Sequence, residues 1–337
     1  MPSGSSVYDA RRMTSLLIVL AMPDEVVARY CEPLKVRFPG IEINAVNHRD
    51  KIDPYIGRTE ILLTFGAMMT DEVYRKAPQL QWVQVLGTGV DKVVDAPTLA
   101  RHVLVTNMHG IHGAPCAEAA IASMLALSRQ LKRSLHAQDR KAWERFPVRI
   151  LAGKTVTIFG IGVIAAALAP LCKAFGMRVI GVTSAPRDLP GFDRVVGRDR
   201  LIEAVGEADH LVLLTPLTRA TREIIGDAVL AAMRPGSVLI NLARGGIVDE
   251  TALTRALEEG RIAGAALDVF SVEPPLQDNK LWALPNVIMT PHLGGFYEEY
   301  PDQVLPVVEE NLRRFLAGER RNMINFVNRE GVEVRSP

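Results

Sequence analysis

The stretch from Lys154 to Ala165 has the residue types and spacing that bind the pyrophosphate of a dinucleotide. Residues 154–159 read as a buried strand, which runs directly into Gly160-Ile161-Gly162-Val163-Ile164-Ala165, a GxGxxA sequence. The first glycine permits a tight turn, the second lets the backbone approach a phosphate, and the alanine allows close packing of helix on strand. The N–H groups that begin the following helix favour anions. The sequence therefore predicts a dinucleotide site at residues 160–164.

The end of the next strand favours NADP over NAD. NAD enzymes place a carboxylate roughly 20 residues beyond the first glycine, where it binds the ribose hydroxyls. Here the predicted strand 177–182 is followed by Thr183, Ser184 and Arg187, without a carboxylate among them. Hydroxyls and an arginine would bind a 2′-phosphate, which a carboxylate would repel. We expect NADP to be preferred and NAD to be possible, although Arg187 can also be read as a solvated loop residue.

Three more motifs follow the fingerprint in order along the chain. They read NLARGGIVDE from Asn241, ALDVFSVEP from Ala266 and TPHLGG from Thr290. Together with the fingerprint they strongly resemble the D-isomer-specific 2-hydroxyacid dehydrogenase family, which includes glyoxylate/hydroxypyruvate reductases and phosphoglycerate dehydrogenases. The resemblance covers residues 16–328.

The resemblance implies the reduction of a small 2-keto acid, such as glyoxylate or hydroxypyruvate, to the D-2-hydroxy acid with NAD(P)H. His292 would be the acid/base, Glu273 would hydrogen-bond the imidazole and stabilise its cation, and Arg244 would bind the substrate carboxylate. Taken singly, a core histidine, a surface carboxylate and a turn-stabilising arginine would explain these residues. Their shared motif context favours catalysis.

The family pattern extends the predicted site to two further groups of residues. The substrate would also meet a glycine loop in the first third of the chain, where backbone N–H groups receive an anion; its residues are Leu86, Gly87, Thr88 and Gly89. Besides the fingerprint and the residues after strand 177–182, the cofactor would meet Thr215, Pro216, Ala243, Asp268, His292 and Gly294, with Asp268 at the nicotinamide amide. No metal site is expected.

Short apolar runs alternate with helical stretches, which predicts an α/β protein with parallel sheets. The predicted strands are 16–21, 41–46, 60–64, 81–86, 103–106, 154–159, 177–182, 210–214, 237–241, 263–267 and 286–289. The predicted helices are 24–37, 70–76, a long one from Glu118 to about His136, 163–175 and 306–316. Pro170 is expected to bend its helix, and Gly176 to end it as a left-handed cap.

The family implies two Rossmann-like domains, one flavodoxin-like and one dinucleotide-binding, with a cleft between them. Residues 1–112 plus 300–337 would form the discontinuous substrate domain, and residues 113–299 the dinucleotide-binding domain. The long helix of the second domain would build a homodimer.

Composition narrows the class of protein. The 337 residues are 48% hydrophobic and 23% charged, with a net charge of +1, which weighs against a nucleic-acid partner. Three separated cysteines suit a reducing cytoplasm rather than disulfides or a metal clip. The apolar run 16–22 is far shorter than the ~20 residues of a membrane span and better fits a buried strand than a secretory signal. Residues 1–13 resemble a disordered leader or a vector-derived extension.

Two other functions remain open at this point. Some relatives are dinucleotide-sensing corepressors, and intact catalytic residues do not exclude that role. Formate or phosphite oxidation is the other alternative. Formate dehydrogenases that resemble this family usually pair the histidine with glutamine, so Glu273 argues against that activity.

Overall fold

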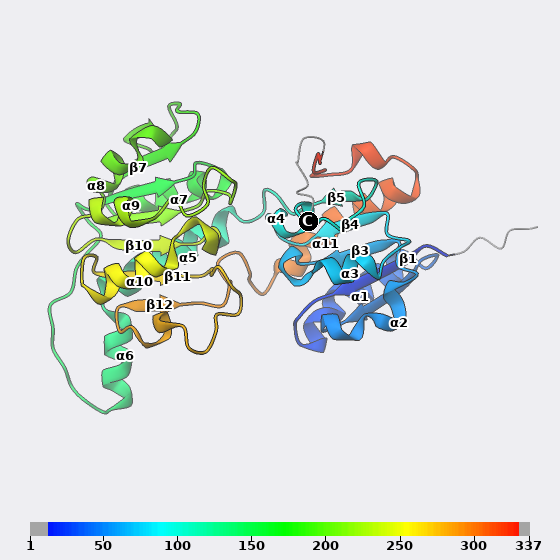
Figure 1. The fold of residues 1–337 in the computed structure, drawn as a ribbon, viewed down its shortest axis with the longest axis horizontal. Helices are drawn as coiled ribbons and strands as arrows, with labels where there is room; N and C mark the ends of the chain where they lie inside the picture. Colours follow the sequence, from blue (N-terminus) through cyan, green and yellow to red (C-terminus); the bar gives the residue numbers. More distant parts are fainter. Residues whose placement is uncertain (1–12, 330–337) are drawn as a thin grey trace, which may run out of the picture. The chain divides into compact units, whose positions relative to one another are not determined.

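The computed structural model describes residues 13–329 and divides the chain into two compact units. Unit 1 combines residues 1–109 with 298–337, so far as they are described, and unit 2 comprises residues 110–297 (Figure 1). The sequence-based boundaries, at 112/113 and 299/300, lie close to these divisions. Apart from Met13, the expected leader lies outside the described residues.

Unit 1 is built on a five-stranded parallel sheet whose strand order is β2-β1-β3-β4-β5, the flavodoxin-like order. The strands are β1 (Ser15–Val19), β2 (Glu42–Val46), β3 (Ile61–Thr64), β4 (Trp82–Val85) and β5 (Leu104–Thr106). The helices are α1 (Asp24–Arg37), α2 (Asp53–Ile56), α3 (Asp71–Arg75), α4 (Asp91–Val94) and α11 (Tyr300–Leu316), with short 3₁₀ turns at Arg49–Lys51, Gly66–Met68 and Arg320–Asn322. Every residue of β1 is buried, which confirms the first strand.

The late helix α11 completes the core of unit 1 (Figure 1). Phe315 stacks on Trp82 of β4 with ring centroids 5.4 Å apart. Asn311 donates to Gln84 Oε1 at 3.0 Å, and the same oxygen accepts from Thr106 Oγ1 at 2.7 Å. Because these buried polar groups satisfy one another, the network joins residues more than two hundred positions apart without leaving unpaired atoms.

Unit 2 is built on a seven-stranded parallel sheet with the order β12-β11-β10-β9-β6-β7-β8, the dinucleotide-binding order with one added strand. The strands are β6 (Thr155–Phe159), β7 (Arg178–Thr183), β8 (Arg194–Gly197), β9 (His210–Leu213), β10 (Val238–Asn241), β11 (Gly264–Leu267) and β12 (Val287–Met289). The helices are α5 (Gly113–Ser128), α6 (Leu131–Asp139), α7 (Val163–Ala174), α8 (Leu201–Gly206), α9 (Asp227–Ala232) and α10 (Glu250–Glu258), with 3₁₀ turns at Arg198–Arg200, Gly245–Ile247 and Lys280–Ala283.

The apolar pattern of the unit 2 strands explains why helices cover both faces of the sheet. Ile158 and Val179 pack on one face with α5 and α7, whereas Phe159 and Ile180 pack on the other with α8, α9 and α10. Neighbouring residues of a strand point to opposite faces, so a continuous apolar run suits a sheet buried on both sides. The expected fold class, two parallel α/β sheets, is confirmed.

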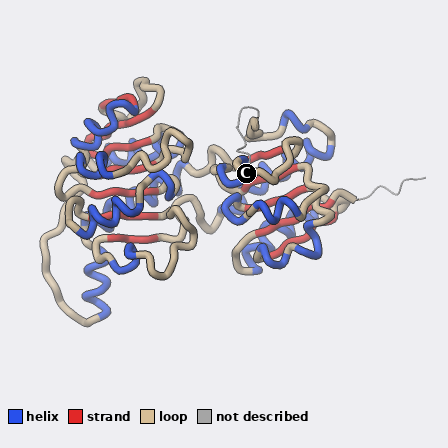
Figure 2. The backbone as a smooth tube through the Cα atoms, in the orientation of Figure 1, coloured by secondary structure: helices blue, strands red, loops and turns tan. Residues whose placement is uncertain are grey.

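Three local expectations about unit 2 and the last helix are wrong. The long helix is two helices, because Gln130 has φ 51° and breaks it between Ser128 and Leu131. The strand β8 is absent from the sequence-based prediction, and α11 begins at Tyr300 rather than at residue 306. After α6 the chain continues as a long loop to β6 (Figure 2).

The expected helix cap is confirmed, because Gly176 has the left-handed φ of 71°. α7 continues through Pro170, which lies inside its span, and the expected bend there stays a prediction. Among residues 13–329, no helix is both long and apolar enough to cross a membrane.

His210, the first residue of β9, is a buried histidine. It is 5% exposed, and its Nδ1 has no hydrogen-bond partner. Burial lowers the pKa of His210 to about 4; Arg149 and Lys154 add to the effect and Asp209 opposes it. The folded protein therefore holds this imidazole neutral at pH values where an unfolded chain, with a pKa near ~6.5, protonates it.

We expect the free energy of unfolding to fall as the pH drops from about 6.5 towards 4, by up to ~3 kcal/mol from His210 alone. Above pH ~6.5 the histidine is neutral in both states and contributes no pH dependence. His210→Asn should flatten this part of the profile, as measured by urea unfolding at a series of pH values.

The matched control is His136→Asn, which changes an exposed histidine on α6. It should keep the wild-type slope. If the free energy of unfolding of His210→Asn falls with decreasing pH as steeply as that of the wild type, His210 is not the source of the pH dependence.

Candidate active site

The three predicted catalytic residues follow three adjacent strands of unit 2. Arg244 comes after β10, Glu273 after β11 and His292 after β12, and these strands are neighbours in the sheet. Because all three strands are parallel, their carboxyl ends lie on the same edge. The structure thus brings residues nearly fifty positions apart to one side of the unit.

His292 and Glu273 form a direct pair. The imidazole Nδ1 lies 2.9 Å from Glu273 Oε2, with 44% of the histidine side chain and 23% of the glutamate side chain exposed. Glu273 Oε1 accepts a second hydrogen bond, 3.0 Å long, from Phe270 N. The carboxylate is therefore fixed by the backbone and fixes the ring in turn, which leaves Nε2 as the nitrogen for proton exchange.

Arg244 is held at the same edge by close backbone packing. A Cβ on the next residue, Gly245, would overlap the backbone of Phe270, so the loop after β10 lies directly against the loop that carries Glu273. The Arg244 Nη1 donates to the carbonyl of Ala243 at 2.7 Å, and Asn241 Nδ2 donates to the carbonyl of Arg244 at 3.1 Å. Ala243, predicted to contact the cofactor, is buried here.

The fingerprint loop has the geometry that the sequence predicts for a dinucleotide site. Gly160 has φ 103°, and a Cβ there would lie 2.5 Å from Thr215 N. Gly162, the residue before α7, faces open space, since no atom lies within 4 Å of where its Cβ would be. Val163 and Ile164 begin α7, whose free N–H groups favour an anion. These residues fit a pyrophosphate.

Other predicted cofactor residues surround this loop. Thr215 follows β9 and is buried against Gly160, whereas Pro216 next to it is exposed. Ile161 turns towards β7, because a Cβ on Gly181 would overlap its side chain. Gly294 is buried, and its N–H donates to Asp268 Oδ2 at 2.8 Å.

A carboxylate absent from the sequence-based prediction lies beside the predicted adenosine end of the cofactor site. Thr183 ends β7, and exposed Ser184 and Arg187 follow, as expected. Thr183 pairs with Gly197 of β8, and a Cβ on Gly197 would overlap Asp199 Oδ1 and lie 3.6 Å from Pro186. Because the sequence does not predict β8, nothing in its pattern places Asp199 beside this loop.

Unit 1 holds the predicted glycine loop, residues 86–89, after β4. The Leu86 side chain is fully buried and its carbonyl accepts from the Tyr300 hydroxyl, which anchors the start of the loop in the core of unit 1. Thr88 is exposed, and its carbonyl accepts from Asn107 Nδ2 at 2.7 Å. Gly87 and Gly89 flank it.

Comparison with known proteins decides the family. Residues 121–294, more than half of the chain, match the family model "D-isomer specific 2-hydroxyacid dehydrogenase, NAD binding domain". The chain is 35% identical to a glyoxylate reductase of Korarchaeum cryptofilum, over 80% of this chain and 84% of that protein. The chain belongs to the D-isomer specific 2-hydroxyacid dehydrogenase family.

Similar proteins in the family differ in name and in length. The chain is 36% identical to a D-3-phosphoglycerate dehydrogenase of Methanocaldococcus jannaschii over 80% of this chain, but it spans about half (52%) of that protein. A family structure from Aeromonas salmonicida has a TM-score of 0.82 at 31% identity, covering 94% of this chain and 100% of that one. An NADPH-dependent glyoxylate/hydroxypyruvate reductase of Sinorhizobium meliloti has a TM-score of 0.78 at 26% identity, covering 94% and 99%.

These findings confirm the expected enzyme class, an NAD(P)-dependent D-2-hydroxyacid dehydrogenase. The relatives are named for different substrates. Similarity to them therefore identifies the enzyme class of this chain but not its substrate.

Cys116 of the dehydrogenase offers no nucleophile at this edge. Cys116 lies in the first turn of α5, where burial raises the pKa of its thiol to about 12. The charge of Asp268 also raises this pKa, whereas that of Arg244 lowers it. A thiol of that pKa is neutral and not a nucleophile. Within residues 13–329 there is no cluster of three or more His, Cys, Asp or Glu side chains suited to a metal ion.

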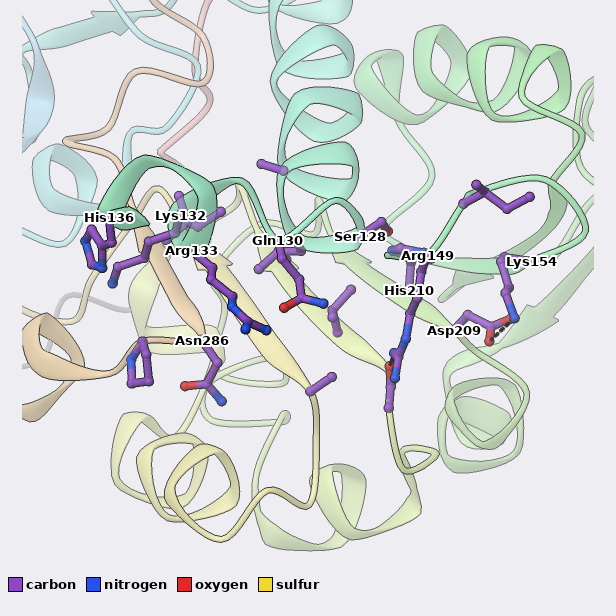
Figure 3. A pocket seen from close by; sticks show the side chains of 18 of the residues that line it. Ser128, Gln130, Lys132, Arg133, His136, Arg149, Lys154, Asp209, His210 and Asn286 are labelled. Atoms are coloured by element: carbon purple, nitrogen blue, oxygen red, sulfur yellow. Dashed lines mark hydrogen bonds and ion pairs between the residues drawn. The ribbon is translucent and has the colours of Figure 1, made fainter. Parts of the chain in front are cut away.

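A cavity in the described part of the dehydrogenase lies away from these residues. It has a volume of about 780 Å³ and is lined by residues at the amino ends of the strands, including Lys154, His210 and Asn286, together with α6 and the loop after it. Figure 3 shows Lys132 and Arg133 reaching from α6 into this space. None of the predicted catalytic or cofactor residues lines it.

The two fingerprint glycines should respond differently to alanine. Gly162→Ala should keep the wild-type free energy of unfolding, because its Cβ meets open space, but weaken dinucleotide binding at least about tenfold by obstructing the phosphates. Gly160→Ala should lose several kcal/mol of stability, because it combines a φ of 103° with backbone overlap.

Both variants are measured by dinucleotide titration calorimetry and by chemical unfolding. Wild-type affinity in Gly162→Ala would remove residue 162 from the phosphate site, whereas a fully stable Gly160→Ala would contradict the loop geometry.

Proposed function

We propose that this dehydrogenase reduces a small 2-keto acid, such as glyoxylate or hydroxypyruvate, to the D-2-hydroxy acid, with NADPH preferred over NADH. The His292–Glu273 pair carries the proposal, because a carboxylate-bound imidazole at the carboxyl edge of a dinucleotide-binding sheet is suited to proton transfer at a carbonyl oxygen. Similarity to proteins named glyoxylate reductase supports the choice of substrate.

Each residue has one task in the proposed reaction. His292 Nε2 donates a proton to the carbonyl oxygen, and Glu273 fixes the opposite ring nitrogen and stabilises the imidazolium before transfer. Arg244 pairs its planar guanidinium with the substrate carboxylate. When bound, the reduced dinucleotide supplies the hydride that the carbonyl carbon receives. The glycine loop at residues 86–89 stays a prediction for substrate binding.

The proposed NADPH preference rests on Thr183, Ser184 and Arg187, whose hydroxyls and guanidinium suit a 2′-phosphate. Asp199 opposes it, since a carboxylate beside this loop repels the added phosphate. We therefore expect a modest preference, with NADH also used.

Two alternative functions predict different activities from the proposed one. A corepressor-like sensor would bind the dinucleotide with negligible turnover, and a formate or phosphite dehydrogenase would oxidise those substrates. Glu273 at the position where formate dehydrogenases usually have glutamine weighs against the latter.

The decisive measurement is steady-state oxidation of NADPH and NADH with a panel of 2-keto acids. We expect turnover with glyoxylate and hydroxypyruvate and a higher kcat/KM with NADPH. Thr183→Asp should lower kcat/KM for NADPH about tenfold, through charge repulsion, and change that for NADH little.

Asp199→Asn is the matched charge change in the opposite direction and should strengthen the NADPH preference. Dinucleotide binding without turnover would favour the sensor, and a tenfold NADH preference in the wild type would contradict the interpretation of the 183–187 loop.

A homodimer is the proposed assembly of unit 2, supported by the segment from α6 to β6. Its apolar side chains are unusually exposed, with Trp143 94% and Ile150 58% exposed, and Leu131 and Leu135 are also exposed. The same segment walls the 780 Å³ cavity (Figure 3). A surface that both projects apolar side chains and contains a hollow suits an isologous contact with a second copy.

Trp143→Ser should shift the dimer towards monomer, which sedimentation velocity measures, because burying a tryptophan commonly dominates an interface. Trp282→Ser, at a half-exposed tryptophan outside this segment, is the control and should leave the distribution unchanged. A wild type that is monomeric at micromolar concentration would contradict the proposed assembly.

A further inference from the structure

Asp268 makes several hydrogen bonds to residues 290–294, the loop that contains His292. A contact with the nicotinamide alone would not require them. Directly after β11, Asp268 is 3% exposed, and its side chain faces residues 290–294. Oδ1 accepts from Thr290 Oγ1 at 2.5 Å and from Leu293 N at 2.8 Å, whereas Oδ2 accepts from Gly294 N at 2.8 Å. Both oxygens are thus engaged by the loop that contains His292.

The backbone of Asp268 adds a fourth link. His292 N donates to the Asp268 carbonyl at 2.9 Å, so one residue binds the loop before, at and after the histidine. Gly294 is fitted to this contact, because a Cβ there would lie 2.9 Å from Asp268 Oδ2. A larger residue would push the loop away from the carboxylate.

The loop needs such an anchor because His292 has a left-handed backbone, with φ 56°. For a non-glycine residue this conformation costs roughly 1 kcal/mol or more, and it persists only where surrounding contacts over-determine it. Four of the hydrogen bonds that do so here come from Asp268, beside those from Thr290 N to the Leu267 carbonyl and from His292 N to the Thr290 carbonyl. They set the direction in which the His292 side chain leaves the backbone, and hence its 2.9 Å contact with Glu273.

We propose that Asp268 is the positioning residue for His292: its carboxylate clamps residues 290–294 and thereby aims the imidazole, and this clamp, rather than a hydrogen bond to the nicotinamide amide, is its main contribution to turnover. The inference rests on the proposed role of His292 as the proton donor. It departs from the family-based expectation for Asp268, because its two oxygens already accept three hydrogen bonds and almost none of its surface is exposed.

The first test separates the clamp from a contact with the amide. Asp268→Asn is assayed with the reduced dinucleotide and with its reduced 3-acetylpyridine analogue, which has no amide N–H to donate. We expect kcat to fall about 100-fold with both, because a misaimed proton donor costs that much regardless of the ring substituent, while the dinucleotide Kd stays within about threefold.

A second variant tests the clamp without touching the carboxylate. Thr290→Val removes one donor to Oδ1 and should lower kcat about tenfold with little change in dinucleotide Kd. The matched control is Thr254→Val, which removes a hydroxyl hydrogen bond of 2.7 Å within α10 and should keep wild-type kcat. Thr290→Val also keeps the proposal testable should Asp268→Asn fail to fold.

Three outcomes decide the matter. A loss in Asp268→Asn that largely disappears with the acetylpyridine analogue, or that is a loss of dinucleotide affinity, overturns the clamp in favour of the amide contact. Wild-type kcat in Thr290→Val also overturns it. Wild-type turnover in His292→Asn would instead show that His292 is not the proton donor. That result would contradict the proposed function, and it differs from the two results that contradict only the role of Asp268.

Discussion

The parallel direction of all seven strands in unit 2 is the constraint on which the rest of the site depends. Parallel strands end on one edge, so the loops after β6, β9, β10, β11 and β12 meet there regardless of their distance in sequence. The fingerprint glycines, Arg244, Glu273 and His292 all lie in those loops. The sheet must be buried on both faces for this arrangement, and the apolar runs of its strands meet that requirement.

Most of the fold and the location of the candidate site could be predicted from the sequence, because they depend on strong local patterns. GxGxxA after an apolar run leaves few alternatives, and the left-handed φ of Gly160 and Gly176 follows from glycine alone. The two-helix form of residues 113–139 could not be predicted, because Gln130 adopts a left-handed backbone that its residue type does not favour. The Ala-rich apolar stretch around it reads as one helix.

The remaining differences from the sequence-based prediction are contacts between segments distant in sequence. Asp199 reaches the end of β7 only because β8 pairs with it, and β8 is a four-residue strand without a clear pattern. The engagement of the Asp268 carboxylate depends on the path of residues 290–294, which spacing does not reveal. Motif spacing thus locates the candidate catalytic residues, while the groups that contact them from distant segments become visible only in three dimensions.

The placement of α11 in unit 1 has a consequence for biosynthesis. A chain emerging from the ribosome exposes β1 to β5 first, yet Trp82 and Gln84 find their partners Phe315 and Asn311 only after all of unit 2 has been translated. Unit 2 is continuous and can acquire its whole core while the chain is still being made. The nascent amino-terminal sheet therefore lacks these packing partners until residues 300–316 have been made, and during that interval its apolar surface is open to other contacts.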